Sequence, residues 1–154
     1  MDETILVIKS LPAPVHCIDI AFTDRYSIAL IDGVAIENAN DEQIQRLAEN
    51  FYNDTYLMDQ NACSSPQIIF WQNANNEQRD KFWNAIEYCA KRKYLLQDAA
   101  VVDKYTFLCE ESISNENIKS IRCTGNLLYR AELKNLQPTI INHRGECGFF
   151  YEYV

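Results

Sequence analysis

Glycine and histidine are scarce in this chain. Its 154 residues include four glycines, and neither GxGxxG nor GxxxxGK[ST] occurs, so a glycine-rich phosphate loop is not indicated. The GxSxG turn of serine hydrolases is missing too. The two histidines stand apart, with no ligand pairs at zinc-finger spacing, and give no support to a zinc site.

Long apolar runs and an excess of positive charge are also missing. No apolar run has the length that crosses a bilayer, and no secretory signal opens the sequence. The net charge of −8 repels nucleic-acid backbones, so neither a membrane span nor a nucleic-acid partner is expected. The length fits one domain with a sizeable core, and the composition is that of a soluble globular protein.

Cysteine, by contrast, occurs six times but never in a CxxC pair. The positions are Cys17, Cys63, Cys89, Cys109, Cys123 and Cys147. A chain of this length without a secretory signal favours reduced thiols in a cytoplasmic protein over a disulfide framework. Most of these cysteines are expected to be small core residues, and the open question is whether Cys63 is one of them.

Short apolar runs alternate with helical patterns along the chain. The predicted strands cover 18–22, 27–31, 67–71, two pieces of 120–133, and the C-terminal GFFYEYV. The predicted helices are a short one or a turn at 1–9, one that follows the N-cap Asn40, one over 76–92, and one over 98–111. This order predicts an α/β fold with a largely parallel central sheet flanked by helices.

The segment DQNACSSPQIIFW, residues 59–71, sets Cys63 apart from the other cysteines. It follows a predicted helix and precedes a buried strand, so we expect Cys63 in a loop at one end of the sheet, where sites collect in open α/β folds. Its neighbours, such as Asn61 and Ser64, are small or polar, which leaves room for a substrate and free backbone N–H groups. A thiolate in such a loop can attack a carbonyl carbon. From these features alone, an idle loop cysteine is the commoner interpretation.

Three segments, in chain order, carry a family resemblance: FTDRYSIALID, DQNACSSPQIIFW and HRGECGFFYEYV. Together they are similar to the long-chain acyl-CoA reductases of bacterial bioluminescence operons, which belong to the aldehyde dehydrogenase superfamily. The stretch from Asp24 to Ser27 resembles the Gly-Gly-Lys-Ser segment of that superfamily, and the Cys63 segment resembles its Gly-Gln-x-Cys segment. The resemblance extends over nearly the whole chain and implies the α/β fold of an aldehyde dehydrogenase catalytic domain.

The resemblance implies a reduction in two stages. The Cys63 thiolate attacks an acyl thioester and expels the carrier thiol, and NADPH then reduces the acyl-cysteine to a fatty aldehyde. Cys63 and Asn61 are the catalytic residues that it implies, and Arg25 and Ser27 are the residues that it places at the cofactor. The expected donor is a long-chain acyl-CoA or an acylated protein. An acyl-protein synthetase is the expected partner, and the full-length protein is expected to be a homo-oligomer.

Two departures from the superfamily bear on this expectation. Hydrolytic members carry a glutamate base just before the Gly-Gly-Lys-Ser segment, whereas the position here lies near Phe22 and no carboxylate follows until Asp24. A missing water-activating base agrees with an enzyme that reduces its acyl intermediate. The dinucleotide fold and an oxyanion-hole asparagine precede this part of the superfamily sequence. We therefore expect the catalytic half of a longer reductase, with 1–22 as a remnant of the nucleotide-binding domain or a connector and 23–154 as the catalytic cysteine domain.

Simpler interpretations stay open for the residues near Cys63. Arg25 can be a solvated or salt-bridged arginine, and Ser27 can simply begin a strand. Gln60 and Asn61 can merely satisfy backbone groups of the loop.

The C-terminal segment carries the last candidates. His143 and Arg144 could hold a pyrophosphate, although a basic pair in a loop is usually surface, and Glu152 is interpreted as an edge-strand charge. The alternative function for the whole chain is a non-catalytic folded fragment that serves as an assembly or oligomerisation module, with Cys63 idle.

Overall fold

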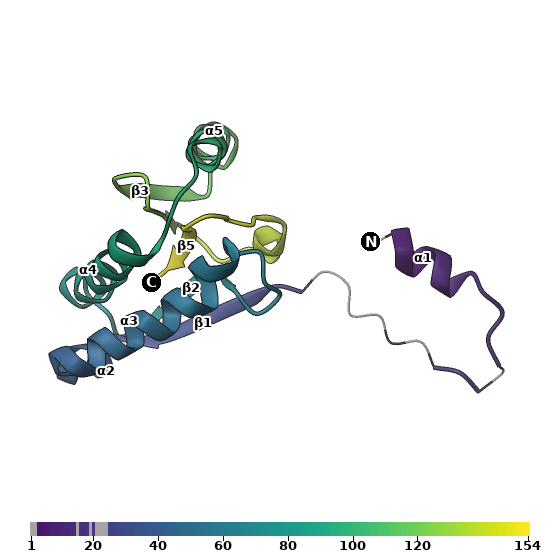
Figure 1. Cartoon of the computed structure of the whole chain (residues 1–154), viewed down its shortest axis with the longest axis horizontal. Coiled ribbons are helices and arrows are strands. Elements are labelled where there is room, and N and C mark those ends of the chain that lie inside the picture. Colours follow the sequence, from purple (N-terminus) through teal and green to yellow (C-terminus); the bar gives the residue numbers. More distant parts are fainter. Residues whose placement is uncertain (1–2, 15, 19, 21–24) are drawn as a thin grey trace.

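A five-stranded sheet forms the centre of the protein in the computed structural model, which describes residues 3–14, 16–18, 20 and 25–154 (Figure 1). The strands are β1 (Ser27–Asp32), β2 (Pro66–Gln72), β3 (Ile118–Thr124), β4 (Leu128–Leu133) and β5 (Phe149–Tyr153). They lie in the order β1-β2-β5-β4-β3. The first four in this order are parallel, and only β3 is antiparallel to its neighbour β4. The predicted α/β fold with a largely parallel sheet is confirmed.

Helices α2 (Gly33–Asn38), α3 (Asp41–Thr55), α4 (Asn76–Lys93) and α5 (Asp98–Ser114) cover the two faces of this sheet. The described residues also form α1 (Glu3–Lys9) and the 3-10 turns η1 (Tyr56–Met58) and η2 (Pro138–Asn142). One face packs against α2, α3 and α4, whose aromatic residues Phe51, Phe82 and Trp83 share a buried cluster with β5. The other face packs against α5 through Phe107 and Leu108. In Figure 1, α1 lies apart from the sheet and from the other helices.

Side-chain caps define where the two long helices of the first face begin. The Asn40 side chain accepts from the Gln43 N–H at 2.9 Å, and the Gln43 side chain accepts from the Asn40 N–H at 2.9 Å. The same reciprocal pair, Asn75 with Gln78, opens α4. These capping boxes satisfy N–H groups that have no partner within the helix. The predicted N-cap at Asn40 is confirmed.

The remaining elements match the sequence expectation in part. The strand expected at 18–22 falls mostly outside the described residues, and the described Ile18 and Ile20 are not in a strand. Helix α5 ends three residues beyond its predicted end. Helix α2 was not predicted, because it has six residues and follows β1 without a loop. It begins at Gly33, where an added Cβ would lie 2.5 Å from the Ala74 backbone, so only glycine fits this close approach.

Candidate functional site

The cysteine loop, residues 59–65, connects η1 to β2 and places Cys63 at the amino end of β2. Because β1, β2 and β5 are parallel, the residues just before β1 and the segment 143–148 before β5 reach the same end of the sheet as the cysteine loop. We call this end, where the parallel strands begin, the amino edge. Sites in open parallel sheets usually lie beyond the carboxyl ends of the strands. The candidate nucleophile therefore lies at one end of the sheet, as predicted, but at the amino edge, which is the less usual one.

Cys63 is exposed and lies in a turn whose ends are joined by the Ser65 N–H and the Ala62 carbonyl at 2.9 Å. The Ser27 hydroxyl donates to the Cys63 carbonyl at 2.7 Å, so the first residue of β1 contacts the backbone of the candidate nucleophile. The N–H groups of Cys63 and Ser64 donate no hydrogen bond to any described residue. The loop thus presents a thiol beside two available donors, which is the arrangement that stabilises a developing oxyanion.

Gln60 ties this loop to the rest of the sheet. Gln60 is 2% exposed, and its side-chain Nε2 donates to the Phe149 carbonyl at 2.9 Å and to the Pro66 carbonyl at 3.2 Å. Its Oε1 accepts from the Gly148 N–H at 3.1 Å. The simpler interpretation, that Gln60 satisfies backbone groups, is confirmed, and the groups include the start of β5 as well as the loop. The neighbouring Asn61 is exposed and donates to the Asp59 carbonyl at 3.3 Å.

The basic residues expected at the site also lie at this edge. The Arg144 guanidinium donates to the Arg25 carbonyl at 2.7 Å and lies over the Tyr26 ring, 5.5 Å from its centroid. The Tyr26 hydroxyl donates to the His143 carbonyl at 3.2 Å. The structure therefore brings the 25–27 segment, which bonds Cys63 through Ser27, against the 143–144 pair.

A buried carboxylate beyond this edge was not anticipated from the sequence. Glu111 of α5 accepts from Asn115 at 2.9 Å and lies 3.2 Å from the Nδ1 of His143. The surface interpretation is therefore wrong for His143, which is half-buried and contacts a buried carboxylate. The Tyr151 hydroxyl is buried near Glu111, and burial first and the adjacent Glu111 carboxylate second raise the pKa of Tyr151. The spacing of these residues along the chain gives no signal of their proximity.

Glu152 lies in a different place from the one that the sequence predicted. It lies in the central strand β5, is 2% exposed, and accepts from the indole N–H groups of Trp71 at 2.9 Å and Trp83 at 2.6 Å. The interpretation as an edge-strand charge is wrong, because β5 lies between β2 and β4. Glu152 lies at the carboxyl end of the sheet and on the α4 face, so it supports the core and does not contact the cysteine loop.

Next to Glu152 in the sheet register is Glu132 of β4, also buried. Glu132 pairs with Arg79 at 2.9 Å and with Lys119 at 2.5 Å. Burial raises the pKa of Glu132, but the hydrogen bonds from Lys119 and Arg79 outweigh it, and the net pKa is lowered. Glu132 therefore forms structural ion pairs, and it lies at the end of the sheet opposite to Cys63.

The other cysteines differ from the expectation that most lie in the core. Cys89 and Cys147 are buried, Cys109 is half-buried, and Cys17, Cys63 and Cys123 are exposed, all without disulfides. Desolvation raises the pKa of Cys89, Cys123 and Cys147. The expectation that most of the six are core residues is therefore wrong, because only Cys89 and Cys147 are buried.

The described helix N-termini do not fit the phosphates of a dinucleotide cofactor. Such phosphates usually sit on open helix N-termini, but in α3 and α4 the capping boxes use the N-cap and N3 N–H groups, and Asp41, Glu42 and Glu77 place carboxylates in the first turns. The close approach at Gly33 leaves no space before α2, and Asp98 places a carboxylate in the first turn of α5.

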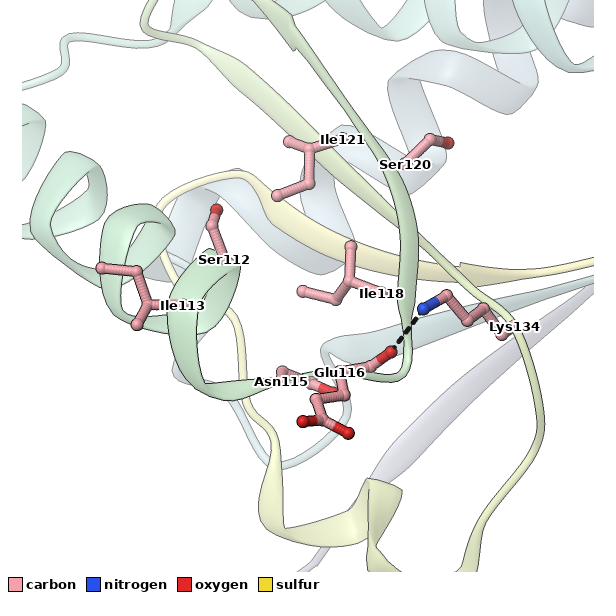
Figure 2. A pocket seen from close by; sticks show the side chains of 8 residues that line it. All are labelled: Ser112, Ile113, Asn115, Glu116, Ile118, Ser120, Ile121 and Lys134. Carbon is pink, nitrogen blue, oxygen red and sulfur yellow. Dashed lines mark hydrogen bonds between the residues drawn. The ribbon is translucent and has the colours of Figure 1, made fainter.

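One cavity among the described residues lies away from the cysteine loop and has a volume of about 610 Å³. Figure 2 shows it between the end of α5 and the β3–β4 hairpin, with Ile113, Ile118 and Ile121 around it and with Lys134, which donates to the Glu116 carbonyl at 2.7 Å. It opens at the carboxyl end of β4, at the edge opposite to Cys63. It is therefore no part of the cysteine site.

Metal and membrane features are absent from the part of the chain that the structure describes. No group of three or more His, Cys, Asp or Glu side chains there could hold a metal ion. None of the helices in the same residues combines the length and the hydrophobicity that a bilayer crossing takes.

Comparison with known proteins adds one family. The family model described as Acyl-CoA reductase (LuxC) matches residues 1–104, which is more than half of the chain and includes Arg25, Ser27 and Cys63. No curated protein matches the chain significantly. The match confirms the family resemblance of the first two segments. The C-terminal segment HRGECGFFYEYV lies beyond the matched range, so its resemblance stays a prediction.

Proposed function

Because the chain belongs to the acyl-CoA reductase (LuxC) family, a family of oxidoreductases, we propose that it carries an acyl-transfer centre with Cys63 as the nucleophile. The Cys63 thiolate attacks the carbonyl carbon of a long-chain acyl-CoA or of an acylated protein. A bond forms between this carbon and Sγ while the bond to the carrier sulfur breaks. The carrier thiolate leaves and takes up a proton, and an acyl thioester remains on Cys63.

One observation carries this proposal: the exposed Cys63 thiol lies in a turn where the N–H groups of Cys63 and Ser64 have no acceptor among the described residues. The N–H groups of Cys63 and Ser64 can donate to the thioester oxygen as it becomes negative. One such donor typically contributes about 10²–10³ in rate. Asn61, whose exposed side-chain amide lies in the same loop, is the proposed side-chain donor to the same thioester oxygen.

We place the negatively charged parts of the ligands near Arg25 and Arg144. Both arginines lie at the same edge as Cys63, and Arg144 is oriented by its contact with the Arg25 carbonyl. Guanidinium groups bind phosphates in a planar, bidentate manner. The Ser27 hydroxyl, in contrast, is already bonded to Cys63, so its proposed part at a cofactor is secondary.

The reductive half of the family's reaction requires a hydride donor, which we propose to be NADPH, with a fatty aldehyde as the product. The described helix N-termini carry side-chain caps or carboxylates and do not favour its phosphates. The steps derived from this structure therefore end at the acyl-cysteine.

Intact-protein mass spectrometry tests the proposal. We expect the 154-residue chain, mixed with a long-chain acyl-CoA, to gain one acyl mass on Cys63 that hydroxylamine removes. Cys63→Ser should gain none, whereas Cys17→Ser, which removes another exposed thiol, should react like the wild type. Acylation of Cys63→Ser to the wild-type extent would refute the assignment.

The alternative, an assembly module, draws on exposed apolar side chains. On β1, an edge strand, Ile28 is 58% and Leu30 is 69% exposed. We propose that this strand face contacts another protein chain, either a second copy or an acyl-protein synthetase. Sedimentation of the wild type and of Ile28→Ser/Leu30→Ser over a range of concentrations tests self-association, and a monomer at all concentrations would leave only the second partner.

A further inference from the structure

The backbone of the cysteine loop is unusual at Asp59 and Gln60. Both residues have positive φ angles, 49° and 64°, although neither is glycine. Such angles cost about 1–3 kcal/mol at a residue with a long side chain, so they persist only where other contacts hold them. The Gln60 N–H donates to the Thr55 carbonyl at 2.7 Å, and its side chain makes the three bonds described above to Pro66, Gly148 and Phe149.

A second contact holds the other end of the loop. Ser27 lies at the start of β1, opposite Pro66 in the register, and its hydroxyl donates to the Cys63 carbonyl at 2.7 Å. The loop is thus fixed three residues before the thiol by Gln60 and at the thiol's own residue by Ser27.

These contacts divide the loop's polar groups in a specific way. The anchoring side chains donate to carbonyl oxygens of Cys63, Pro66 and Phe149, and none of them accepts from the N–H of Cys63 or Ser64. In a planar trans peptide the N–H points away from the carbonyl, so the Ser27 bond to the Cys63 carbonyl orients the Ser64 N–H to the opposite side. The Ala62 carbonyl, which accepts from the Ser65 N–H, orients the Cys63 N–H in the same way. A loop held in this way keeps both donors available to a ligand.

We propose that Gln60 and Ser27 are positioning residues for Cys63, which set the thiol and the adjacent N–H groups in the geometry for attack on a carbonyl carbon. This inference rests on the proposed function and adds to it two residues that do not themselves touch the substrate. A displacement of about 1 Å at a reacting centre can cost about 10²-fold in rate. The anchors therefore act on the rate of acyl transfer and not on binding of the acyl donor.

The experiment uses two acyl donors on the 154-residue chain. One is p-nitrophenyl acetate, which needs the thiol and the oxyanion donors but no recognition of CoA, and the other is a long-chain acyl-CoA. The variants are Gln60→Glu, Ser27→Ala and Ser27→Thr, with Gln45→Glu on the exposed face of α3 as the matched control. Peptide mass spectrometry gives the rate and the final extent of acylation at Cys63 and, for comparison, at Cys17.

Gln60→Glu keeps the oxygen that accepts from Gly148 but loses both N–H donors. We expect its maximal rate at Cys63 to fall about 10- to 100-fold, with unchanged final extent and unchanged half-saturating donor concentration. Ser27→Ala should lower the rate about 3- to 10-fold, whereas Ser27→Thr, which keeps the hydroxyl, should restore it. Gln45→Glu and the rate at Cys17 should not change.

A merely structural role gives a different pattern. An unfolded fraction would reduce the final extent of acylation at Cys63 and expose Cys89 and Cys147, without lowering the rate constant of the folded part. That pattern, or wild-type rates in folded Gln60→Glu and Ser27→Ala, overturns the proposal. If Gln60→Glu does not fold, the Ser27→Ala and Ser27→Thr pair decides, because that change removes a single bond at an accessible position.

The two donors separate this inference from the proposed function. A wild-type Cys63 that reacts with the ester and depends on Gln60, but never accepts an acyl group from acyl-CoA, would refute the function and leave the positioning intact. A wild-type Cys63 that reacts with the ester no faster than Cys17 refutes the positioning.

Discussion

At the scale of single residues, exposure does not distinguish Cys63 from Cys17, since both thiols reach solvent. The backbone around them does. The Cys17 N–H donates to the Pro14 carbonyl at 2.8 Å, whereas the Cys63 N–H has no acceptor among the described residues. Nucleophilic catalysis on a thioester needs a thiol and a donor for the oxyanion at one place. Of the two, only Cys63 meets both conditions, which makes Cys17 an internal control.

Glu152 offers a stability prediction at the same scale. Its buried Oε1 accepts from two indole N–H groups, of Trp71 and Trp83, and hydrogen bonds to a charged acceptor are stronger than those to a neutral one. Glu152→Gln keeps the size of the side chain but removes its charge. It also places amide N–H donors next to the indole N–H donors. We expect the free energy of unfolding to fall by about 1–3 kcal/mol in urea titration.

Glu146→Gln is the control for this change, because Glu146 is exposed and lies in the segment just before β5. It should leave the free energy of unfolding within about 0.5 kcal/mol of the wild type. Equal effects of the two substitutions would show that the indole contacts do not stabilise the fold.

The misplacement of Glu152 has a definite physical origin. A glutamate among aromatic residues at a chain end has the pattern of an edge strand, whose charges prevent sheet-to-sheet association. The partners that reverse this interpretation, Trp71 and Trp83, lie 81 and 69 residues away along the chain. Strand order depends on such long-range pairing, which a local pattern does not contain.

At the scale of elements, the N-cap of α4 can be tested by one substitution. Asn75→Ala removes the side-chain oxygen that accepts from the Gln78 N–H at 3.0 Å. We expect a loss of about 1 kcal/mol in the free energy of unfolding, which lowers Tm by about 2–4 °C.

Asn84→Ala provides the matched control within α4. Asn84 is exposed in the helix interior, where alanine has the better helix propensity. This change should be neutral or stabilise by a few tenths of a kcal/mol. A destabilisation as large as that of Asn75→Ala would mean that asparagine is needed in this helix for a reason other than capping.

Lys104 links α5 to the loops that precede β4 and β5. It is fully buried, donates to the carbonyls of Asn126 and Cys147, and lies over the Tyr129 ring. Desolvation lowers the pKa of Lys104 to about 8. In the unfolded chain a lysine titrates near pH ~10.4, so between about pH 8 and pH 10 the unfolded state binds more protons than the folded state.

The sign of this linkage is that Lys104 increasingly favours the folded state as the pH rises through this window. Across the window the gain reaches at most about 3 kcal/mol. We expect the stability of the wild type relative to Lys104→Met to increase between pH 7.5 and pH 9.5, measured by urea unfolding at each pH. Other titrating groups are common to both proteins and largely cancel in this difference.

Lys91→Met, at an exposed lysine of α4, is the control for Lys104→Met and should follow the wild type at every pH. A difference between wild type and Lys104→Met that does not change with pH would show that the buried amine has an ordinary pKa.

The elements themselves were predictable where local physics defines them. The apolar periodicity and the cap at Asn40 predicted α3, and the run at 67–71 predicted β2. Helix α2 was missed because six residues show too little periodicity, and Gly33 at its start usually indicates a turn. The bonds of Gln60 to Gly148 and Phe149 join segments 88 and 89 residues apart, which no local pattern can show.

At the scale of the whole molecule, alternation of strands and helices was sufficient to predict the parallel sheet. Alternation alone does not say at which end of the sheet Cys63 lies. Its place in the loop before β2 puts it at the amino edge, whereas phosphate-binding helices in parallel sheets follow their strands. The described chain therefore places the candidate nucleophile at the amino edge, and its helix N-termini are partly capped or carry carboxylates in their first turns.

The last prediction concerns the separation of acyl transfer from reduction in the 154-residue chain. We expect it to form the acyl-cysteine but to show no binding of NADPH at micromolar concentration and no fatty aldehyde when acyl-CoA and NADPH are supplied together. The physical reason is that dinucleotide phosphates need open, positively polarised helix N-termini, whereas those of α3 and α4 are partly capped and carry the carboxylates of Asp41, Glu42 and Glu77 in their first turns. Fluorescence titration of NADPH and gas chromatography of the products measure the two outcomes. Aldehyde formation by the purified chain would contradict this prediction, and Arg144→Ala would then test whether the basic residues at the amino edge hold the cofactor.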